Sequence, residues 1–457
     1  MAVDIERLVG RISSEGRILP IAGAIRGFFD PALAIRFDQA NFDGIAMMPR
    51  VADAARNRPD RCPVLWSEVR AELLAQTRRL NAAPRLASLY EAMRLAADRE
   101  AGDSVDLTMF VERVISEPLL DTIVAGLSRR QHAILVANQR RKIAHVLYPT
   151  PRRAHGVTAF FPRLIRWADH ISDFRAGRAV SRALRRRMSG RSPPQDDYAQ
   201  AVLRLADRLG LLRATYAVTT ILTAIAGAPG TVAACALYEL LRHPDWFGRV
   251  RGELSALTLE ELLADPVRLA PVTHRVLKEV MRLWSFPLMV QRRVLKDFAV
   301  DGHAMRAGES YFLSSYAEHR DADVWEEPAR FNPDRWLRPS AGGGAYVPFG
   351  WASRTCVGAS LGLSQHIVFL HLMSTTFDIT LLAPGTEYMG LDGIAAPEAM
   401  RVRISRRQDG APPPNRASRR DEWSRHGDIA AMPGVDSPLP SQGESSCPPL
   451  PPTKLIA

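Results

Sequence analysis

The residues best suited to chemistry surround one cysteine in the last quarter of the chain. In the segment YVPFGWASRTCVGASLGL, Cys356 stands between Gly350 and Gly358, two positions after Arg354, and an apolar segment with helical periodicity follows. A tight turn at a helix start directs backbone N–H groups at the sulfur, which lowers the pKa of a thiol and favours the thiolate. Glycines also let a backbone pass close to a flat macrocycle. The segment therefore predicts a thiolate that ligates a metal held by a planar cofactor.

Two segments upstream carry charges that could brace this loop. Glu279 and Arg282, in VLKEVMRLW, are three residues apart on a predicted helix, so they share a helix face and can pair. Pro328, Arg330 and Phe331 follow within DADVWEEPARFNPDRW. Taken alone, Glu279 and Arg282 also fit an ordinary surface ion pair.

The three segments together resemble the cytochrome P450 family. The family's haem loop reads Phe-Gly-x-Gly-x-Arg-x-Cys-x-Gly, which this chain matches except that Ala352 replaces the second glycine. Glu279 and Arg282 resemble its Glu-x-x-Arg helix, and Arg330 lies in a segment that resembles its Pro-x-Arg-Phe sequence. The resemblance covers residues 30–405.

This resemblance implies a cofactor and a set of residues that hold it. The cofactor is haem b, with Cys356 as the iron ligand and Arg330 joining Glu279 and Arg282 in a structural trio. The propionates would be neutralised by Arg354, Arg293 and Arg141. Further haem contacts would come from Phe349, Gly350, Gly358, Ala226 and Gly227. Substrate contacts, which could equally be plain core residues, would be Phe286, Leu288, Met289 and Val290.

The central helix departs from the family pattern, which has Ala/Gly-Gly-x-Asp/Glu-Thr-Thr over the distal face of the haem. Here the text is AIAGAPGTVAACALYELLRHP. If the family pattern is aligned by counting back from the final His-Pro without a gap, its acid and first threonine fall on Gly227 and Ala228. If its Ala/Gly-Gly is aligned with Ala226 and Gly227 instead, Pro229 stands in place of the acid and Thr231 in place of the second threonine. Either register lacks the carboxylate, and Pro229 predicts a kink.

Thr231 is the candidate catalytic residue in this helix, as a proton relay if it faces the haem. Equally, its hydroxyl could bond back to a helix carbonyl, which is the preferred interpretation for Thr219, Thr220 and Thr223. Without the acid, protons could come from a substrate hydroxyl or a water chain. Alternatively the enzyme could use peroxide or catalyse a rearrangement that needs no oxygen cleavage.

The pattern along the chain predicts a mainly helical protein with small sheets, and the resemblance implies that this is the cytochrome P450 fold. Residues 30–405 form the haem domain, after an N-terminal segment at 1–29. Residues 406–457, rich in Pro and Ser, predict a disordered tail. The uncharged stretch at 214–238 is long enough for a membrane span, but its Thr, Gly and Pro favour a buried helix. Asp4, Glu6 and Arg7 exclude an N-terminal anchor.

Composition limits the partners. The formal charge of +11 allows an acidic partner, but the basic residues are scattered and no nucleic-acid-binding motif is present, which argues against nucleic acid. The four cysteines form no zinc-site spacing, and Cys62 and Cys235 fit small buried hydrophobes.

The resulting functional prediction is a cytoplasmic, monomeric monooxygenase that oxidises a hydrophobic small molecule in specialised metabolism. Electrons would come from a ferredoxin and its reductase. The rival from another class is a haem protein that binds or senses a ligand without turnover.

Overall fold

Helices make up most of the described chain, which confirms the mainly helical prediction. The computed structural model describes residues 17–22, 25–42, 64–147, 160–286, 288–294, 296–338, 344–351, 354–390 and 394–407. The predicted disordered tail lies almost wholly outside these residues. In chain order the helices are α2 (Pro31–Phe42), α4 (Trp66–Leu80), α5 (Ala83–Glu100), α6 (Leu107–Ser116), α7 (Leu120–Ile123), α8 (Arg129–Leu147), α9 (Phe160–Met188), α10 (Tyr198–Leu203), α11 (Ala206–Ala224), α12 (Ala228–Arg242), α13 (Pro244–Ser255), α14 (Leu259–Ala264), α15 (Pro266–Leu269), α16 (Pro271–Trp284), α17 (Ser315–Glu318), the 3-10 helix η3 (Pro333–Leu337) and α18 (Ala359–Thr376).

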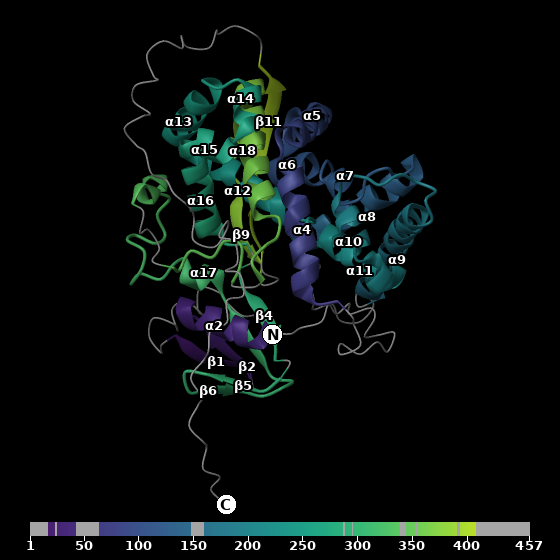
Figure 1. The fold of residues 1–457 in the computed structure, drawn as a ribbon. Coiled ribbons are helices and arrows are strands. Elements are labelled where there is room, and N and C mark those ends of the chain that lie inside the picture. Colours follow the sequence, from purple (N-terminus) through teal and green to yellow (C-terminus); the bar gives the residue numbers. More distant parts are fainter. Residues whose placement is uncertain are drawn as a thin grey trace, which may run out of the picture. The chain divides into compact units, whose positions relative to one another are not determined.

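The helices α12, α16 and α18 form the centre of the main hydrophobic core. The helix α18, predicted to begin just after Cys356, is apolar and buried along nearly its whole length, as expected of a helix surrounded by others. It packs against α4, α5, α12, α13 and α16, while α6 packs against α12. Figure 1 shows α4 and α6 beside this central group. The cysteine loop therefore leads into a long helix that is buried along most of its length.

The stretch predicted as one long buried helix is two helices, α11 and α12, separated at residues 225–227. Gly227 precedes α12 with φ at 100°, a left-handed value that favours glycine. Pro229 stands in the first turn of α12, where a missing N–H costs no helical hydrogen bond. Residues 206–242 are long and apolar enough to cross a membrane, but 56% of their most apolar window is buried within the protein. The break predicted from Pro229 is present, just before that residue.

Short strands lie before, between and after the helices, which agrees with the predicted small sheets. One sheet has the order β1-β2-β7-β4 and another β3-β11-β8, while β5 pairs with β6 and β9 with β10. The strands are β1 (Ile18–Ala22), β2 (Ile25–Phe28), β3 (Gly102–Asp106), β4 (Val290–Arg293), β5 (Phe298–Val300), β6 (His303–Met305), β7 (Ser310–Leu313), β8 (Phe377–Ala383), β9 (Thr386–Gly390), β10 (Ile394–Glu398) and β11 (Arg401–Arg406).

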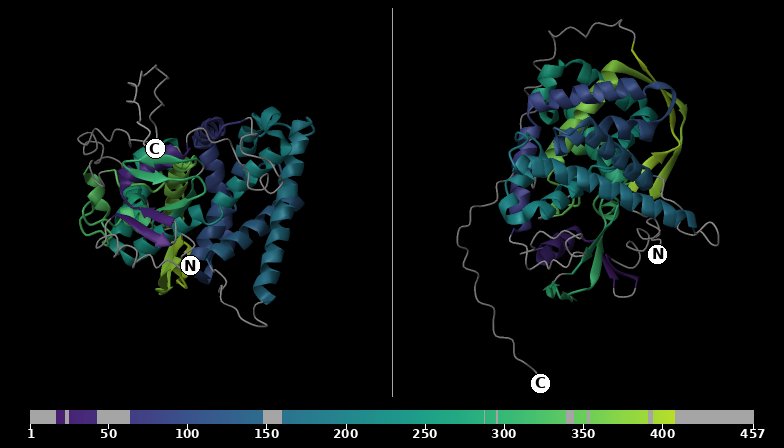
Figure 2. Two further views of the ribbon diagram at one scale, coloured as in Figure 1. Left: turned by 90° about the horizontal axis from the view of Figure 1, so that it is seen from below. Right: turned by 90° about the vertical axis from the view of Figure 1, so that its right-hand side faces the viewer.

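The N-terminal strands belong to the main folded unit. The strand β2 runs parallel to β7, with Ile25 opposite Ser310, and Figure 2 (left) shows the purple strands alongside the green ones. Sheet pairing satisfies the backbone groups of both strands. The folded unit therefore begins before residue 30, the boundary expected from the sequence.

Candidate active site around Cys356

The cysteine loop is a tight turn closed by backbone hydrogen bonds. The N–H of Cys356 donates to the carbonyl of Phe349 over 2.8 Å, and the N–H of Gly350 donates to the carbonyl of Val347 over 3.1 Å. Gly350 has φ at 87°, where a side chain would be strained. These contacts hold Cys356 directly before the first turn of α18.

Two opposing influences act on the Cys356 thiol. Burial, the larger influence, raises its pKa, while the backbone N–H of Gly358 and the charge of Arg70 lower it. Arg70 comes from α4, and its guanidinium donates to the carbonyl of Thr355. A positive charge and an N–H donor are the groups that stabilise a thiolate.

Side chains from α4 and α10 support the loop just after Cys356. The hydroxyl of Thr77 donates to the carbonyl of Val357 over 2.9 Å and lies 2.7 Å from the hydroxyl of Tyr198. Both residues are buried. This support fixes the backbone on the C-terminal side of Cys356.

Arg354 lies beside a second arginine and a shared carboxylate. Its Nε is 3.8 Å from Oδ1 of Asp38, a buried residue of α2, and the Nε of Arg292 is 2.9 Å from the same oxygen. Burial and the neighbouring Arg292 lower the pKa of Arg354. Two guanidinium groups that share one carboxylate favour a further anion, such as a propionate. Arg293 ends β4 opposite Ser310, and its predicted role at the second propionate stays a prediction.

Glu279 and Arg282 form the predicted pair, and both side chains are fully buried. Their bidentate contact is 2.8 and 3.0 Å long. The second arginine on Glu279 is Arg335, whose Nε donates over 3.0 Å. Arg330 was the wrong choice, because its side chain is 65% exposed and pairs with Glu327 on the surface. It contributes only its carbonyl, which accepts from Arg282.

His319 connects this charged group to the cysteine loop. Its carbonyl accepts from Arg282 over 2.8 Å, and its Nε2 accepts from the N–H of Val347 over 2.9 Å. Its Nδ1 lies 2.7 Å from the hydroxyl of Ser285. Burial, reinforced by the charge of Arg282, lowers the pKa of His319 to about 3. A neutral imidazole therefore accepts at one nitrogen and donates at the other.

A small apolar cluster surrounds the break between α11 and α12. Ala226 at the break packs with Ile143 of α8 and Ala396 of β10, and Met109 of α6 and Phe286 pack against them. Five separate segments thus meet at the position where the resemblance expects the substrate. Phe286 was predicted to contact substrate and Ala226 to contact haem, while the other three carry no local sequence signal.

The other predicted substrate residues lie elsewhere or show no contact with this cluster. Leu288 belongs to the main core, and its carbonyl accepts from Ser314. Val290 pairs with Leu313 in the sheet and packs against the second core cluster. Met289 is half-buried. Their predicted contact with substrate therefore stays a prediction.

Thr231 contacts a carboxyl group from another helix, whereas α12 has no acid at the position of the family's acid. Its hydroxyl donates to Oε1 of Glu112, on α6, over 3.1 Å, and the hydroxyl of Ser116 donates to Oε2 over 3.0 Å. All three side chains are buried. Burial raises the pKa of Glu112 to about 8, against the lowering effect of these two hydroxyls. The structure thus brings an acid to α12 from another helix.

The remaining threonines behave as expected for helix residues. The hydroxyls of Thr219 and Thr220 donate to the carbonyl of Tyr216, and that of Thr223 donates to the carbonyl of Thr219. The predicted bonding back to the helix is confirmed for these three. Thr231 differs because it bonds across to α6.

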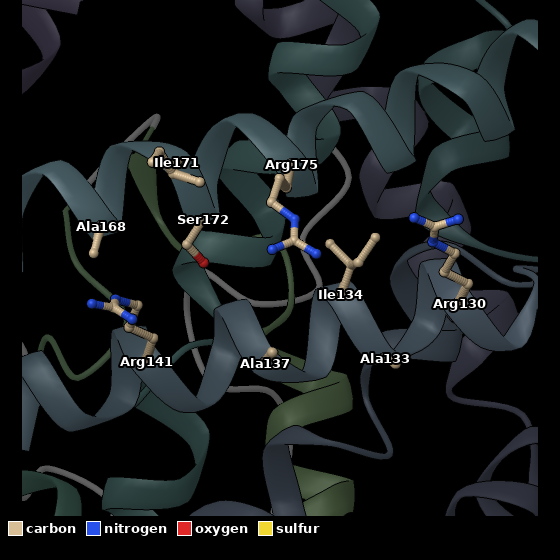
Figure 3. Close-up of a pocket in the computed structure, with 9 residues that line it drawn as sticks. All are labelled: Arg130, Ala133, Ile134, Ala137, Arg141, Ala168, Ile171, Ser172 and Arg175. Atoms are coloured by element: carbon tan, nitrogen blue, oxygen red, sulfur yellow. The ribbon is translucent and has the colours of Figure 1, made fainter.

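Arg141 lies in a surface pocket between α8 and α9, not at the cysteine loop. It forms an ion pair with Asp169, and Figure 3 shows it facing α9 across the pocket. The pocket has a volume of about 390 Å³ and is lined by Arg130, Ala133, Ile134, Ala137, Arg141, Ala168, Ile171, Ser172 and Arg175. The predicted role at a propionate is unsupported by these contacts. The early-helix arginine beside the loop is Arg70, which only the three-dimensional arrangement of α4 identifies.

The same arrangement of helices occurs in solved haem proteins. The crystal structure of the cytochrome P450DA heme domain aligns with a TM-score of 0.71, covering 89% of this chain and 94% of that one at 21% identity. At this identity the likeness establishes the fold. The cytochrome P450 family model matches residues 160–393, just over half of the chain. The chain therefore belongs to the cytochrome P450 family.

Curated relatives match a shorter part of the chain. Cytochrome P450 81F1 of Arabidopsis thaliana is 35% identical over 146 residues, which are 30% of this chain and 29% of that protein. Putative cytochrome P450 139 of Mycobacterium tuberculosis is 31% identical over 144 residues, 30% of this chain and 33% of that protein. The match thus spans about a third or less of these relatives' lengths.

The residues around Cys356 fit the haem that the family implies. Burial raises the pKa of its thiol, but the Cys356 side chain is still accessible to solvent, so a ligand can approach the sulfur. A Cβ on Gly358 would lie 3.9 Å from the sulfur, at contact distance, so glycine leaves more room there. The neighbouring guanidinium groups of Arg354 and Arg292 suit a propionate. Cys356 would be the iron ligand.

Proposed function

We propose that this chain is a haem-thiolate monooxygenase that inserts oxygen into a hydrophobic small molecule. The observation that carries this proposal is the position of Cys356, held in a braced loop beside an N–H donor and Arg70. Haem b, when bound, would supply reductive activation of dioxygen, with the thiolate favouring O–O cleavage.

The protein's own groups would orient the substrate and exclude water. The apolar cluster at the break offers apolar and aromatic contacts without a charged side chain, from Ala226, Ile143, Ala396, Met109 and Phe286. Such a lining favours a hydrophobic substrate, because burial of apolar surface supplies the binding energy. Specialised metabolism, a monomeric state and a cytoplasmic location remain predictions.

An acidic electron donor of the ferredoxin type fits the surface at the C-terminal end of α4. Arg78 and Arg79 are exposed in the last turn of α4, the helix that also carries Arg70. Like the net charge of +11, these arginines would steer an acidic partner. Thr77, the residue before Arg78, donates to the carbonyl of Val357, which follows Cys356.

The ultraviolet-visible spectrum of the reduced, carbon monoxide-bound protein tests the proposal. We expect the red-shifted Soret band of a thiolate-ligated haem in the wild type and its loss in Cys356→Ser. The matched control is Cys235→Ala, at a buried cysteine of α12, which should keep the band. A wild-type spectrum typical of histidine ligation would contradict the assignment.

Peroxide use is the second candidate, favoured by Pro229 and Gly230 at the places of the family's acid and threonine. Oxygen consumption with a ferredoxin, its reductase and NADPH separates the two functions. Oxidation that proceeds with peroxide but never with oxygen and reductant would establish the second candidate. A bound haem with neither reaction would support a binding or sensing role.

A further inference from the structure

We propose that Glu112 of α6 replaces the acid missing from α12 and stores the proton that Thr231 passes toward the oxygen-activating site. This inference rests on the proposed monooxygenase function and names the source of its protons. Because Glu112 acts through Thr231, it is a positioning residue.

The contacts place this carboxyl next to the break in α12. Glu112 accepts from the side chain of Thr231 over 3.1 Å, and the N–H of Thr231 also bonds to it. Met109, one helical turn earlier on α6, packs against the apolar cluster that contains Ala226. The carboxyl therefore lies about one helical turn along α6 from the apolar cluster.

Gly230 explains how the carboxyl reaches this position. A Cβ at residue 230 would lie 2.2 Å from Oε2 of Glu112 and 2.3 Å from its carboxyl carbon, closer than real Cβ contacts. Gly230 also occupies the place of the family's first threonine when Ala226 and Gly227 are in register. The same exchange that removes this threonine thus makes room for an acid from α6.

No cation among the described residues bonds to Glu112. On α18, His366 lies 2.9 Å from the carbonyl of Pro229, and burial lowers its pKa to about 4, so it is neutral near pH 7. Arg113, the next residue on α6, pairs with Glu100, and Glu239 on α12 accepts from Trp284. With only hydroxyl and N–H partners, burial keeps Glu112 protonated near pH 7.

The proton movement is a simple exchange between oxygen atoms. When protonated, Glu112 donates to the oxygen of Thr231, which reverses the direction of the hydrogen bond that the ionised carboxylate would accept. The hydroxyl of Thr231 then turns and releases its own proton toward the oxygen-activating site. Glu112 then regains a proton from solvent. In the overall reaction, dioxygen, two electrons from the ferredoxin, two protons and R–H give R–OH and water, so this exchange supplies protons and no electrons.

The first test is an infrared titration of the haem-loaded protein with labelled glutamate. We expect a protonated carboxyl band in the wild type that disappears as the pH rises through about 8, and that is absent in Glu112→Gln. A wild type without a band attributable to Glu112 at pH 7 would overturn the proposal. This readout needs neither substrate nor turnover, so it is independent of the proposed monooxygenase function.

The second test measures peroxide released per oxygen consumed, with ferredoxin, its reductase and NADPH but no substrate. Two protons and two electrons reduce dioxygen to hydrogen peroxide, whereas four of each give two waters. We expect this ratio to rise with pH in the wild type, as Glu112 ionises. In Glu112→Gln and Thr231→Val it should be high and independent of pH, because the stored proton is lost.

Glu253→Gln is the matched control for a merely structural effect. Glu253 is likewise a mostly buried glutamate that accepts from a threonine hydroxyl and N–H in the first turn of a helix, here Thr273 of α16. We expect it to keep the wild-type ratio and pH profile. An unchanged ratio in Glu112→Gln would overturn the proposal. If that variant fails to fold, the infrared titration of the wild type and the Thr231→Val ratio decide it.

Discussion

The Nε of Arg335 lies 3.0 Å from Oε1 of Glu279, the same oxygen to which Arg282 donates over 2.8 Å. One fully buried carboxylate thus binds two guanidinium groups. It also accepts from the N–H of Asn332 over 3.0 Å and from the indole N–H of Trp336 over 3.1 Å. Because His319 bonds to both Arg282 and Val347, this charged group helps to fix the start of the cysteine loop.

Removing Arg335 should destabilise the protein far more than removing Arg330. Arg335→Ala leaves part of a buried charge without its partner, which costs about 3 kcal/mol. Arg330→Ala removes an exposed ion pair and should change stability by less than about 0.5 kcal/mol. Urea unfolding of both variants, with haem retention measured in parallel, checks this. Equal losses would contradict the assignment of Arg335 to the trio.

Replacement of His319 should change how the stability of the protein depends on pH in the acidic range. Its folded pKa, about 3, is below the ordinary value of 6.5, so the unfolded chain binds the proton first as the pH falls. Stability therefore declines from pH 6.5 toward 3, by up to about 1.4 kcal/mol per pH unit for this group. His319→Gln should reduce that slope, although it lowers stability at pH 7. His170→Gln, at an exposed site, should leave the slope unchanged in the same urea titrations.

Loss of Arg70 should weaken the hold on haem. Arg70→Met removes a charge-assisted hydrogen bond to the carbonyl of Thr355 and a positive charge beside the thiolate. We expect haem binding by the apoprotein to weaken about tenfold. The control is Arg78→Met, an exposed change on the same helix. Affinity that falls equally in both variants would show that Arg70 has no special role.

Glu112 should make the protein less stable at alkaline pH. Its folded pKa of about 8 is raised above the ordinary 4.5, so the native state retains a proton that the unfolded chain has lost. Stability from this group is present below pH 4.5 and declines up to about pH 8, at about 1.4 kcal/mol per pH unit where steepest. In urea unfolding, the stability of Glu112→Gln should depend less on pH over this window. An identical slope in both proteins would contradict the raised pKa.

The parts of the site that the sequence could predict are those formed by neighbouring residues. The turn around Cys356, the pair of Glu279 and Arg282, and the helix after the cysteine each depend on spacings within one segment. Local geometry determines them, because residues three apart on a helix share a face in any context. The break near Pro229 follows equally from a single residue type.

The parts that sequence could not settle depend on which side chains the fold turns inward. The chain contains Pro-x-Arg-aromatic twice, at Pro328 and at Pro333, and only the turn of η3 shows that Arg335 is the buried one. Arg141 was predicted for the early helix from its neighbouring residues, whereas Arg70 is identified by the packing of α4 beside the cysteine loop. Glu112 is one polar residue of α6 in the sequence, and its partner Thr231 is 119 positions away.

The close approach of Gly230 to Glu112 also restricts how this sequence can change. Threonine at 230 and glutamate at 112 would occupy the same space, since even a Cβ would come within 2.2 Å of the carboxyl. A chain that regained the family's usual threonine would therefore first need a smaller residue at 112. Gly230→Thr alone should be harmful, and Glu112→Ala should rescue it. The order of the two substitutions would then decide which evolutionary route between the two arrangements stays open.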